Sequence, residues 1–362
     1  MTAVANVFFL DTTLTNSADA RRRLHDRFHA SGVRHQPSAT VSVTIDDIRA
    51  ARIRLAPLLS PSPLRNYREL DDAVGHGVRV SVKHENFNPT GSFKVRNGLS
   101  FMTALPDDAR ARGVVAATRG NHGLGLAYAG RAFGVRVTVC VPLGNNPDKN
   151  AGMQALGARL IEEGRDYDES LLVADRIMDV EGATLAHSTN NPHIIAGAGT
   201  LSLELIEQEP QIDSVVVAIG GGSQAVGALT VLGALKPGAK VYGIQAEGAA
   251  ASHASWKARK PMELDKADTI ADGLATRSTY EMTFQTLVDG LADFITVSDA
   301  EIADAMRMLL RTTHTMIEPA GAAGLAGLRK LAPKLEGQRV GIVLSGANVD
   351  SATLQRVLSG AV

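Results

Sequence analysis

The stretch Val215-Val-Val-Ala-Ile-Gly-Gly-Gly-Ser-Gln224 decides the fold class, because an apolar β-branched run leads there directly into a glycine-rich turn and a helix start. From about residue 45 the chain alternates such runs with longer Ala- and Leu-rich stretches of helical periodicity. This alternation is typical of parallel βαβ units, so we predict an α/β fold. The expected strands are residues 80–82, 113–117, 136–141, 159–161, 214–219, 241–245 and 340–344.

Three turns that follow expected strands are candidate ligand sites: residues 118–123, 220–223 and 345–348. In open parallel sheets, ligands bind beyond the carboxyl ends of the strands. Glycines at 220–222 allow consecutive backbone N–H groups to point at one anion, and the following helix start adds favourable potential, so we predict a phosphate cradle. A glycine-rich turn that merely packs tightly is the alternative. The turn lacks the features of nucleotide triphosphate and dinucleotide motifs.

Composition favours a small-molecule partner over a polymer or a membrane. The 362 residues contain 37 basic and 38 acidic side chains, so no net field attracts nucleic acid or an anionic membrane surface. The lone cysteine, Cys140, excludes an intramolecular disulfide and fits a reducing compartment. Because no apolar run is long enough to cross a bilayer and no secretory signal is recognisable, we expect a cytoplasmic protein.

Lys94 is the candidate reactive residue, within Asn88-Pro-Thr-Gly-Ser-Phe-Lys-Val-Arg96. The preceding turn places Lys94 near a helix start facing the same crevice as the glycines. Partial desolvation and nearby helix N–H dipoles lower the pKa of an amine toward the range useful for Schiff-base chemistry. An isolated lysine is usually a solvated surface group, so this interpretation depends on the neighbouring motifs.

Seven separated segments, taken in order, resemble the serine/threonine dehydratases of the fold type II pyridoxal-phosphate enzymes, over about residues 44–357. They are Lys83-x-Glu85, Pro89-Thr-Gly-Ser-Phe-Lys94-x-Arg96, Gly120-Asn-His-Gly123, Gly220-Gly-Gly-Ser223, Thr269-Ile-Ala-Asp-Gly273, Glu318-Pro319 and Leu344-Ser-Gly-Ala-Asn-Val-Asp350. The resemblance implies a tryptophan synthase β-like fold of two interleaved open twisted-sheet lobes. We expect an N-terminal extension at 1–43, a large cofactor-binding lobe at 44–112 and 188–362, and a small mobile lobe at 113–187.

The resemblance also implies a set of roles around pyridoxal 5'-phosphate. Lys94 carries the cofactor as a Schiff base and later removes the substrate Cα proton. Asn121 bonds the cofactor's phenolic oxygen, and Ser345 faces its pyridine nitrogen. The phosphate lies in the glycine cradle. The expected cofactor-binding residues are Phe93, Lys94, Asn121, Gly220, Gly221, Gly222, Ser223, Gln224 and Ser345.

The implied reaction is α,β-elimination of a β-hydroxy amino acid, with threonine or serine as the default substrate and 3-hydroxyaspartate, phenylserine or a hydroxyectoine-derived amino acid as options. A cysteine synthase-like β-replacement enzyme and a non-catalytic cofactor-binding protein are alternatives. The resemblance also implies a homodimer or homotetramer. The expected substrate-binding residues are Ser92, Thr118, Arg119, Gly120 and His122.

Arg119 departs from the family's pattern, because racemising relatives carry there a serine that reprotonates Cα. An arginine is a poor proton donor at neutral pH, so we predict little serine racemase activity. Arg119 either binds a second substrate carboxylate or serves a structural or solvated role. We expect no metal site: Glu247 is a weak candidate, since His253 occupies the position of an aspartate ligand. We interpret His122 as a buried hydrogen-bonding residue and not as a metal ligand.

Overall fold

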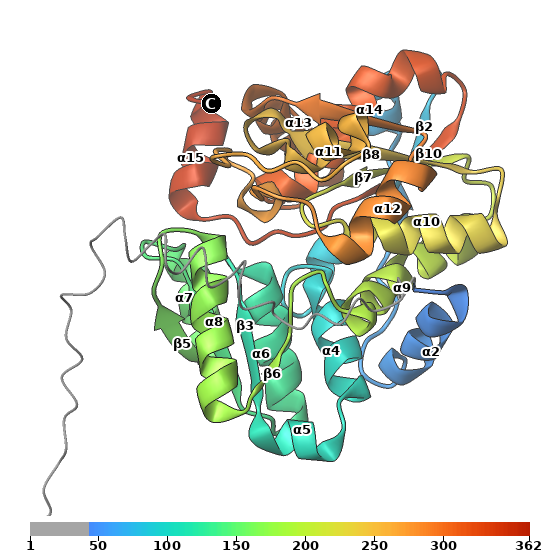
Figure 1. Ribbon diagram of the computed structural model, residues 1–362. Helices are drawn as coiled ribbons and strands as arrows, with labels where there is room; N and C mark the ends of the chain where they lie inside the picture. The colour runs from blue at the N-terminus through green and yellow to red at the C-terminus, as the bar shows by residue number, and fades with distance from the viewer. Residues whose placement is uncertain (1–42) are drawn as a thin grey trace, which may run out of the picture. The chain divides into compact units, whose positions relative to one another are not determined.

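A computed structural model describes residues 43–362, whose strands form two sheets (Figure 1). The larger sheet has six strands in the order β1-β2-β10-β7-β8-β9, and every neighbouring pair is parallel except β1 with β2. Its strands are β1 (Leu64–Asn66), β2 (Arg79–Lys83), β7 (Ser214–Ala218), β8 (Lys240–Ala246), β9 (Asp293–Val297) and β10 (Arg339–Val343).

The smaller sheet has four parallel strands in the order β5-β4-β3-β6. Its strands are β3 (Val114–Ala117), β4 (Val137–Val141), β5 (Arg159–Glu162) and β6 (Thr184–Leu185). The predicted α/β class is confirmed, and all seven expected strands are present. Three further strands, β1, β6 and β9, were not predicted. They lie at sheet edges and are short or partly exposed, so they lack the continuous apolar run of a buried strand.

Helices cover both faces of the six-stranded sheet (Figure 1). Val216 of β7 packs in a core with α13 and α14, whereas Val215 and Val217 pack in a core with α2, α9 and α10. Alternate residues of one strand thus point to opposite buried faces, which explains its unbroken apolar run. These helices are α2 (Ile45–Leu55), α9 (Pro192–Gln208), α10 (Ser223–Leu235), α13 (Asp299–Thr313) and α14 (Pro319–Leu331).

The first of these helices, α2, has a capping box at its N-terminus. Thr44 caps α2 by accepting a hydrogen bond from the Asp47 backbone, and the Asp47 side chain accepts one from the Thr44 backbone in return. The other helices and 3-10 turns are α3 (Arg68–Val74), η2 (Glu85–Phe87), α4 (Lys94–Ala104), α5 (Asp107–Arg112), α6 (Asn121–Phe133), α7 (Pro147–Ala155), α8 (Tyr167–Glu181), η3 (Glu247–Ala249), α11 (Ala251–Ala258), η4 (Asp272–Leu274), α12 (Glu281–Gly290), η5 (Ala332–Leu335) and α15 (Ser351–Ser359).

The core of the four-stranded sheet also includes a helix from the segment assigned above to the large lobe. Leu99 of α4 shares a hydrophobic cluster with Val114 and Val139 of this sheet and with Leu126 of α6. Packing therefore crosses the boundary proposed between residues 112 and 113, and the division into lobes stays a proposal. The proposed N-terminal extension lies outside the described residues, apart from residue 43. Within residues 43–362, no helix is both long and apolar enough to span a bilayer.

Candidate active site

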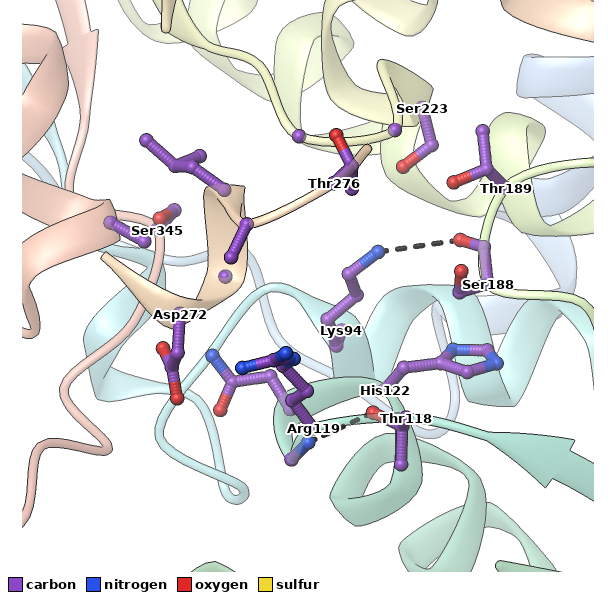
Figure 2. Close-up of a pocket in the computed structure, with 18 of the residues that line it drawn as sticks. Lys94, Thr118, Arg119, His122, Ser188, Thr189, Ser223, Asp272, Thr276 and Ser345 are labelled. Carbon is purple, nitrogen blue, oxygen red and sulfur yellow. Dashed lines mark hydrogen bonds between the residues drawn. The ribbon is translucent and has the colours of Figure 1, made fainter. Parts of the chain in front are cut away.

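One pocket brings together the three turns that follow β3, β7 and β10 (Figure 2). The predicted residues that line it are Phe93, Lys94, Thr118, Arg119, Gly120, Asn121, His122, Gly220, Gly221, Gly222, Ser223, Gln224 and Ser345. These turns meet because their strands run parallel, so that each strand's carboxyl end opens on the same edge of its sheet.

Backbone pairing joins the Lys94 segment to the turn after β10. Ser92 and Gly346 form an isolated β-bridge, and the Phe93 N–H donates to the Ser345 carbonyl at 3.0 Å. The side chain of Asn348 adds a bond to the Thr90 carbonyl at 2.8 Å. This pairing fixes Lys94 and Ser345 in one pocket although 250 residues separate them in the sequence.

A buried ionic network holds the start of α4. Arg96 lies within hydrogen-bonding distance of Glu85 at 2.8 Å and of Glu204 at 2.7 Å, and Lys83 meets Glu204 at 2.8 Å. All four residues are almost fully buried. Each carboxylate therefore faces cations, as buried charges require. Because Arg96 is two residues beyond Lys94, the network anchors the helix turn that carries the candidate reactive amine.

The Lys94 amine points into the pocket, and its Nζ donates to the Ser188 carbonyl at 3.4 Å (Figure 2). The side chain is only partly accessible, and the pocket walls surround the amine. Burial lowers the pKa of Lys94 from 10.5 to about 8. A substantial fraction of the amine is thus neutral near physiological pH, which is the form that attacks an aldehyde.

The glycine turn after β7 forms a cradle at the N-terminus of α10. Gly222 has a φ of 96°, which L side chains rarely adopt, and a Cβ on Gly221 would lie 2.0 Å from Thr189 Oγ1. Thr276 also lines the pocket, and its buried hydroxyl has no hydrogen-bond partner among the described residues. A free helix start, close glycine backbone and an unused hydroxyl are the features of an anion site.

Asn121 is held from two sides. Its Nδ2 donates to Glu318 Oε1 at 2.6 Å, and its Oδ1 accepts from Asn348 Nδ2 at 2.8 Å. Burial raises the pKa of Glu318 to about 7, while the nearby Lys149 opposes that rise. Lys149 pairs with Asp272 at 2.6 Å and lies 3.7 Å from Glu318. This cluster fixes the direction of the Asn121 amide and leaves its second N–H free for a ligand.

Thr118 and His122 line the pocket but already have hydrogen bonds of their own. The Gly120 N–H donates to Thr118 Oγ1 at 2.9 Å, which holds the turn before α6. His122 Nε2 donates to the Ala186 carbonyl at 2.8 Å. Burial, with a smaller effect of the Lys94 charge, lowers the pKa of His122 to about 3, so the ring is neutral. Ser92 is fully buried and is not among the lining residues, so its expected substrate contact gains no support.

Several lining residues were not predicted as site residues, although some belong to recognised motifs. Asp272 and Glu318 lie in segments that carried the family resemblance, which was a usable signal. Tyr167 and Tyr280 line the pocket without any recognised motif, and the Tyr167 hydroxyl lies 3.0 Å from Ser188 Oγ. The other unpredicted polar lining residues are Lys149, Ser188, Thr189 and Thr276.

The weak metal candidate lies away from this pocket. Glu247 is exposed in η3 and does not line the pocket. Across residues 43–362, no group of three or more His, Cys, Asp or Glu side chains is arranged to hold a metal ion.

Known proteins similar to this chain share its fold and much of its length. Residues 55–346 match the family described as pyridoxal-phosphate dependent enzymes. An L-threonine ammonia-lyase of Thermotoga maritima is 35% identical over 318 residues, covering 88% of this chain and 78% of that protein. An L-threo-3-hydroxyaspartate ammonia-lyase of a Pseudomonas species is 33% identical over 315 residues, covering 87% of this chain and 98% of that protein. The structure of maize serine racemase superimposes with a TM-score of 0.82 at 32% identity, covering 88% of this chain and 98% of the racemase chain.

Proposed function

Because the chain belongs to the family of pyridoxal-phosphate dependent enzymes, we propose that it is an ammonia-lyase that converts β-hydroxy amino acids to 2-oxo acids and ammonia by α,β-elimination. The observation that carries this proposal is the meeting of the buried Lys94 amine and the glycine cradle in one pocket. Relatives named as ammonia-lyases for threonine and threo-3-hydroxyaspartate support the reaction class.

The pocket residues fit pyridoxal 5'-phosphate. The amine of Lys94 has a pKa lowered to about 8, which suits bonding to an aldehyde. Gly220, Gly221, Gly222 and Ser223 would hold the phosphate in the cradle, where a Cβ on Gly221 would collide with Thr189. Phe93 and Gln224 border this space, and the free N–H of Asn121 suits the phenolic oxygen.

The bound cofactor supplies an aldehyde that captures the substrate amine and a ring that withdraws electrons from Cα. The chain's residues do the rest. The Lys94 amine takes the Cα proton, and the backbone N–H groups in the first turn of α6 bind the substrate α-carboxylate. Ser345, which lines the pocket, would present its hydroxyl to the ring nitrogen of the cofactor. A hydroxyl does not stabilise a protonated ring as a carboxylate does, which favours prompt loss of the β-hydroxyl.

The division into lobes, a cytoplasmic location and self-association also belong to the proposal. We assign residues 44–112 and 188–362 to a cofactor-binding lobe and 113–187 to a mobile lobe. A homodimer or homotetramer is supported by the exposed side chains of Ile53 and Leu235, which line one surface groove together with Ile206. The single free Cys140 is buried and fits a reducing compartment.

A panel of β-hydroxy amino acids tests the reaction. Threonine, serine, phenylserine and threo-3-hydroxyaspartate are incubated with the enzyme, with and without a thiol, and 2-oxo acid and ammonia are measured. We expect both products in equal amounts whether or not the thiol is present. A thioether product formed at the expense of ammonia and 2-oxo acid indicates β-replacement instead. Lys94→Ala should lose both the visible absorbance of the bound cofactor and the activity, and retention of activity refutes the role of Lys94.

A further inference from the structure

Arg119 carries a charge that the rest of the pocket does not use. Three cationic side chains line the pocket: Lys94, Arg119 and Lys149. Lys149 pairs with Asp272, and Lys94 is reserved for the cofactor aldehyde. Among residues 43–362, Arg119 makes no ion pair and no side-chain hydrogen bond, and its Nε is buried without an acceptor. Figure 2 shows its side chain among the pocket residues.

The carboxylates of the pocket are already engaged. Asp272 accepts from Lys149 at 2.6 Å, and Glu318 accepts from Asn121 at 2.6 Å. These two are the acidic side chains that line the pocket. An arginine that borders a ligand space without an acidic partner is suited to an anion from the ligand, since its planar fork matches a carboxylate.

The α-carboxylate of an amino acid has a separate site. Gly120 is the N-cap of the 13-residue helix α6 and has no side chain to cap it, so backbone N–H groups of the first turn are free. These N–H groups, together with the helix dipole, can bind one carboxylate. The guanidinium of Arg119 is therefore available for a second one on the same substrate.

We propose that Arg119 selects β-hydroxy amino acids whose side chain ends in a carboxylate, and that it binds this second carboxylate. This inference rests on the elimination reaction proposed above. The substrate loses its Cα proton and its β-hydroxyl as water. Hydrolysis of the resulting imine consumes one water and releases ammonia, so a 2-oxo dicarboxylic acid forms without any co-reactant.

The test compares substrates and variants by kcat/KM. For the wild-type holoenzyme we expect a higher value with threo-3-hydroxyaspartate than with threonine. Arg119→Gln should lower the value for threo-3-hydroxyaspartate by about 30-fold or more, mainly through KM, because a buried charge pair loses one partner. The value for threonine should change less than about threefold, within the usual effect of a change outside any contact. Arg131→Gln changes an exposed arginine on α6, the helix that follows Arg119; it is the matched control and should change neither value.

Two outcomes of this comparison overturn the inference. Equal losses on both substrates assign Arg119 to the α-carboxylate or to folding, and a wild-type enzyme that prefers threonine shows that the second carboxylate is not selected. Arg119→Lys separates folding from binding, because it keeps the charge but loses the fork and should recover only part of the preference.

A binding measurement keeps this inference distinct from the proposed reaction. Aspartate and 2-aminobutyrate lack a β-hydroxyl, so their binding is followed by the change in visible absorbance of the bound cofactor. Arg119→Gln should weaken aspartate binding about 30-fold or more and leave 2-aminobutyrate within about threefold. If no β-hydroxy amino acid is consumed but this difference holds, the proposed elimination fails and the acidic-ligand inference stands. If the difference is absent, the inference fails whatever the reaction.

Discussion

The capture of pyridoxal 5'-phosphate by the apoprotein should follow the titration of Lys94. Burial lowers the pKa of this amine from 10.5 to about 8. At pH 7 an amine with that pKa is about 9% neutral, whereas an ordinary lysine is about 0.03% neutral. The reactive form is thus about 300 times more abundant than in an exposed lysine. Raising the pH from 6 to 10 should increase the rate of capture with a midpoint near 8 and a plateau above about 9.

Stopped-flow absorbance at the visible band of the bound cofactor measures this rate at each pH. N-acetyl-lysine methylamide mixed with the cofactor serves as the reference, and its rate should keep rising through its own pKa near 10.5. Lys94→Ala should show no visible band at any pH. A rate for the wild-type apoprotein that still climbs about tenfold per pH unit above pH 9 contradicts the reasoning, because it shows that the pocket does not desolvate the amine.

Three further predictions concern Glu318, Gly221 and Arg119, which all line the pocket. The raised pKa of Glu318 means that folding favours its protonated form, so stability is fully present below its unfolded value of 4.5 and falls as the pH rises to about 7. By urea denaturation of the apoprotein, the free energy of unfolding of the wild type should fall by roughly 2–3 kcal/mol relative to that of Glu318→Gln between pH 5 and pH 8, and parallel pH profiles of the two proteins contradict this expectation. Gly221→Ala should weaken cofactor binding at least about tenfold in an equilibrium titration, since its Cβ would lie 2.0 Å from Thr189 Oγ1. Gly238→Ala, with no atom within 4 Å of the added Cβ, should bind as wild type does. The rate of D-serine formation from L-serine should stay below about one tenth of the elimination rate, because Arg119 is a poor proton donor. Comparable rates of the two reactions would refute the prediction that this enzyme racemises serine poorly.

Local patterns were enough to predict the elements that frame the site. β7 and the cradle that follows it are contiguous in sequence, so a buried strand, a glycine turn and a helix start can be recognised without any tertiary contact. The same holds for Lys94, which begins α4 directly after the expected turn. The edge strands β1 and β9 were not predicted, because their burial depends on neighbours that come from elsewhere in the chain.

The sequence by itself determined the α/β class and the strands of both sheet interiors, and it located a lysine at a helix start and a glycine turn after a buried strand, because each of these depends on residues within about one strand-turn-helix unit. Only the folded chain brings that lysine and that turn into one pocket. Only the tertiary structure decided that Glu318 orients Asn121 and that Thr189 lies close to the backbone of Gly221 in the cradle. It also decided that Arg119 has no acidic partner within residues 43–362. Those relations join residues that are tens to hundreds of positions apart, and sheet order and helix packing, which no local pattern specifies, set their distances.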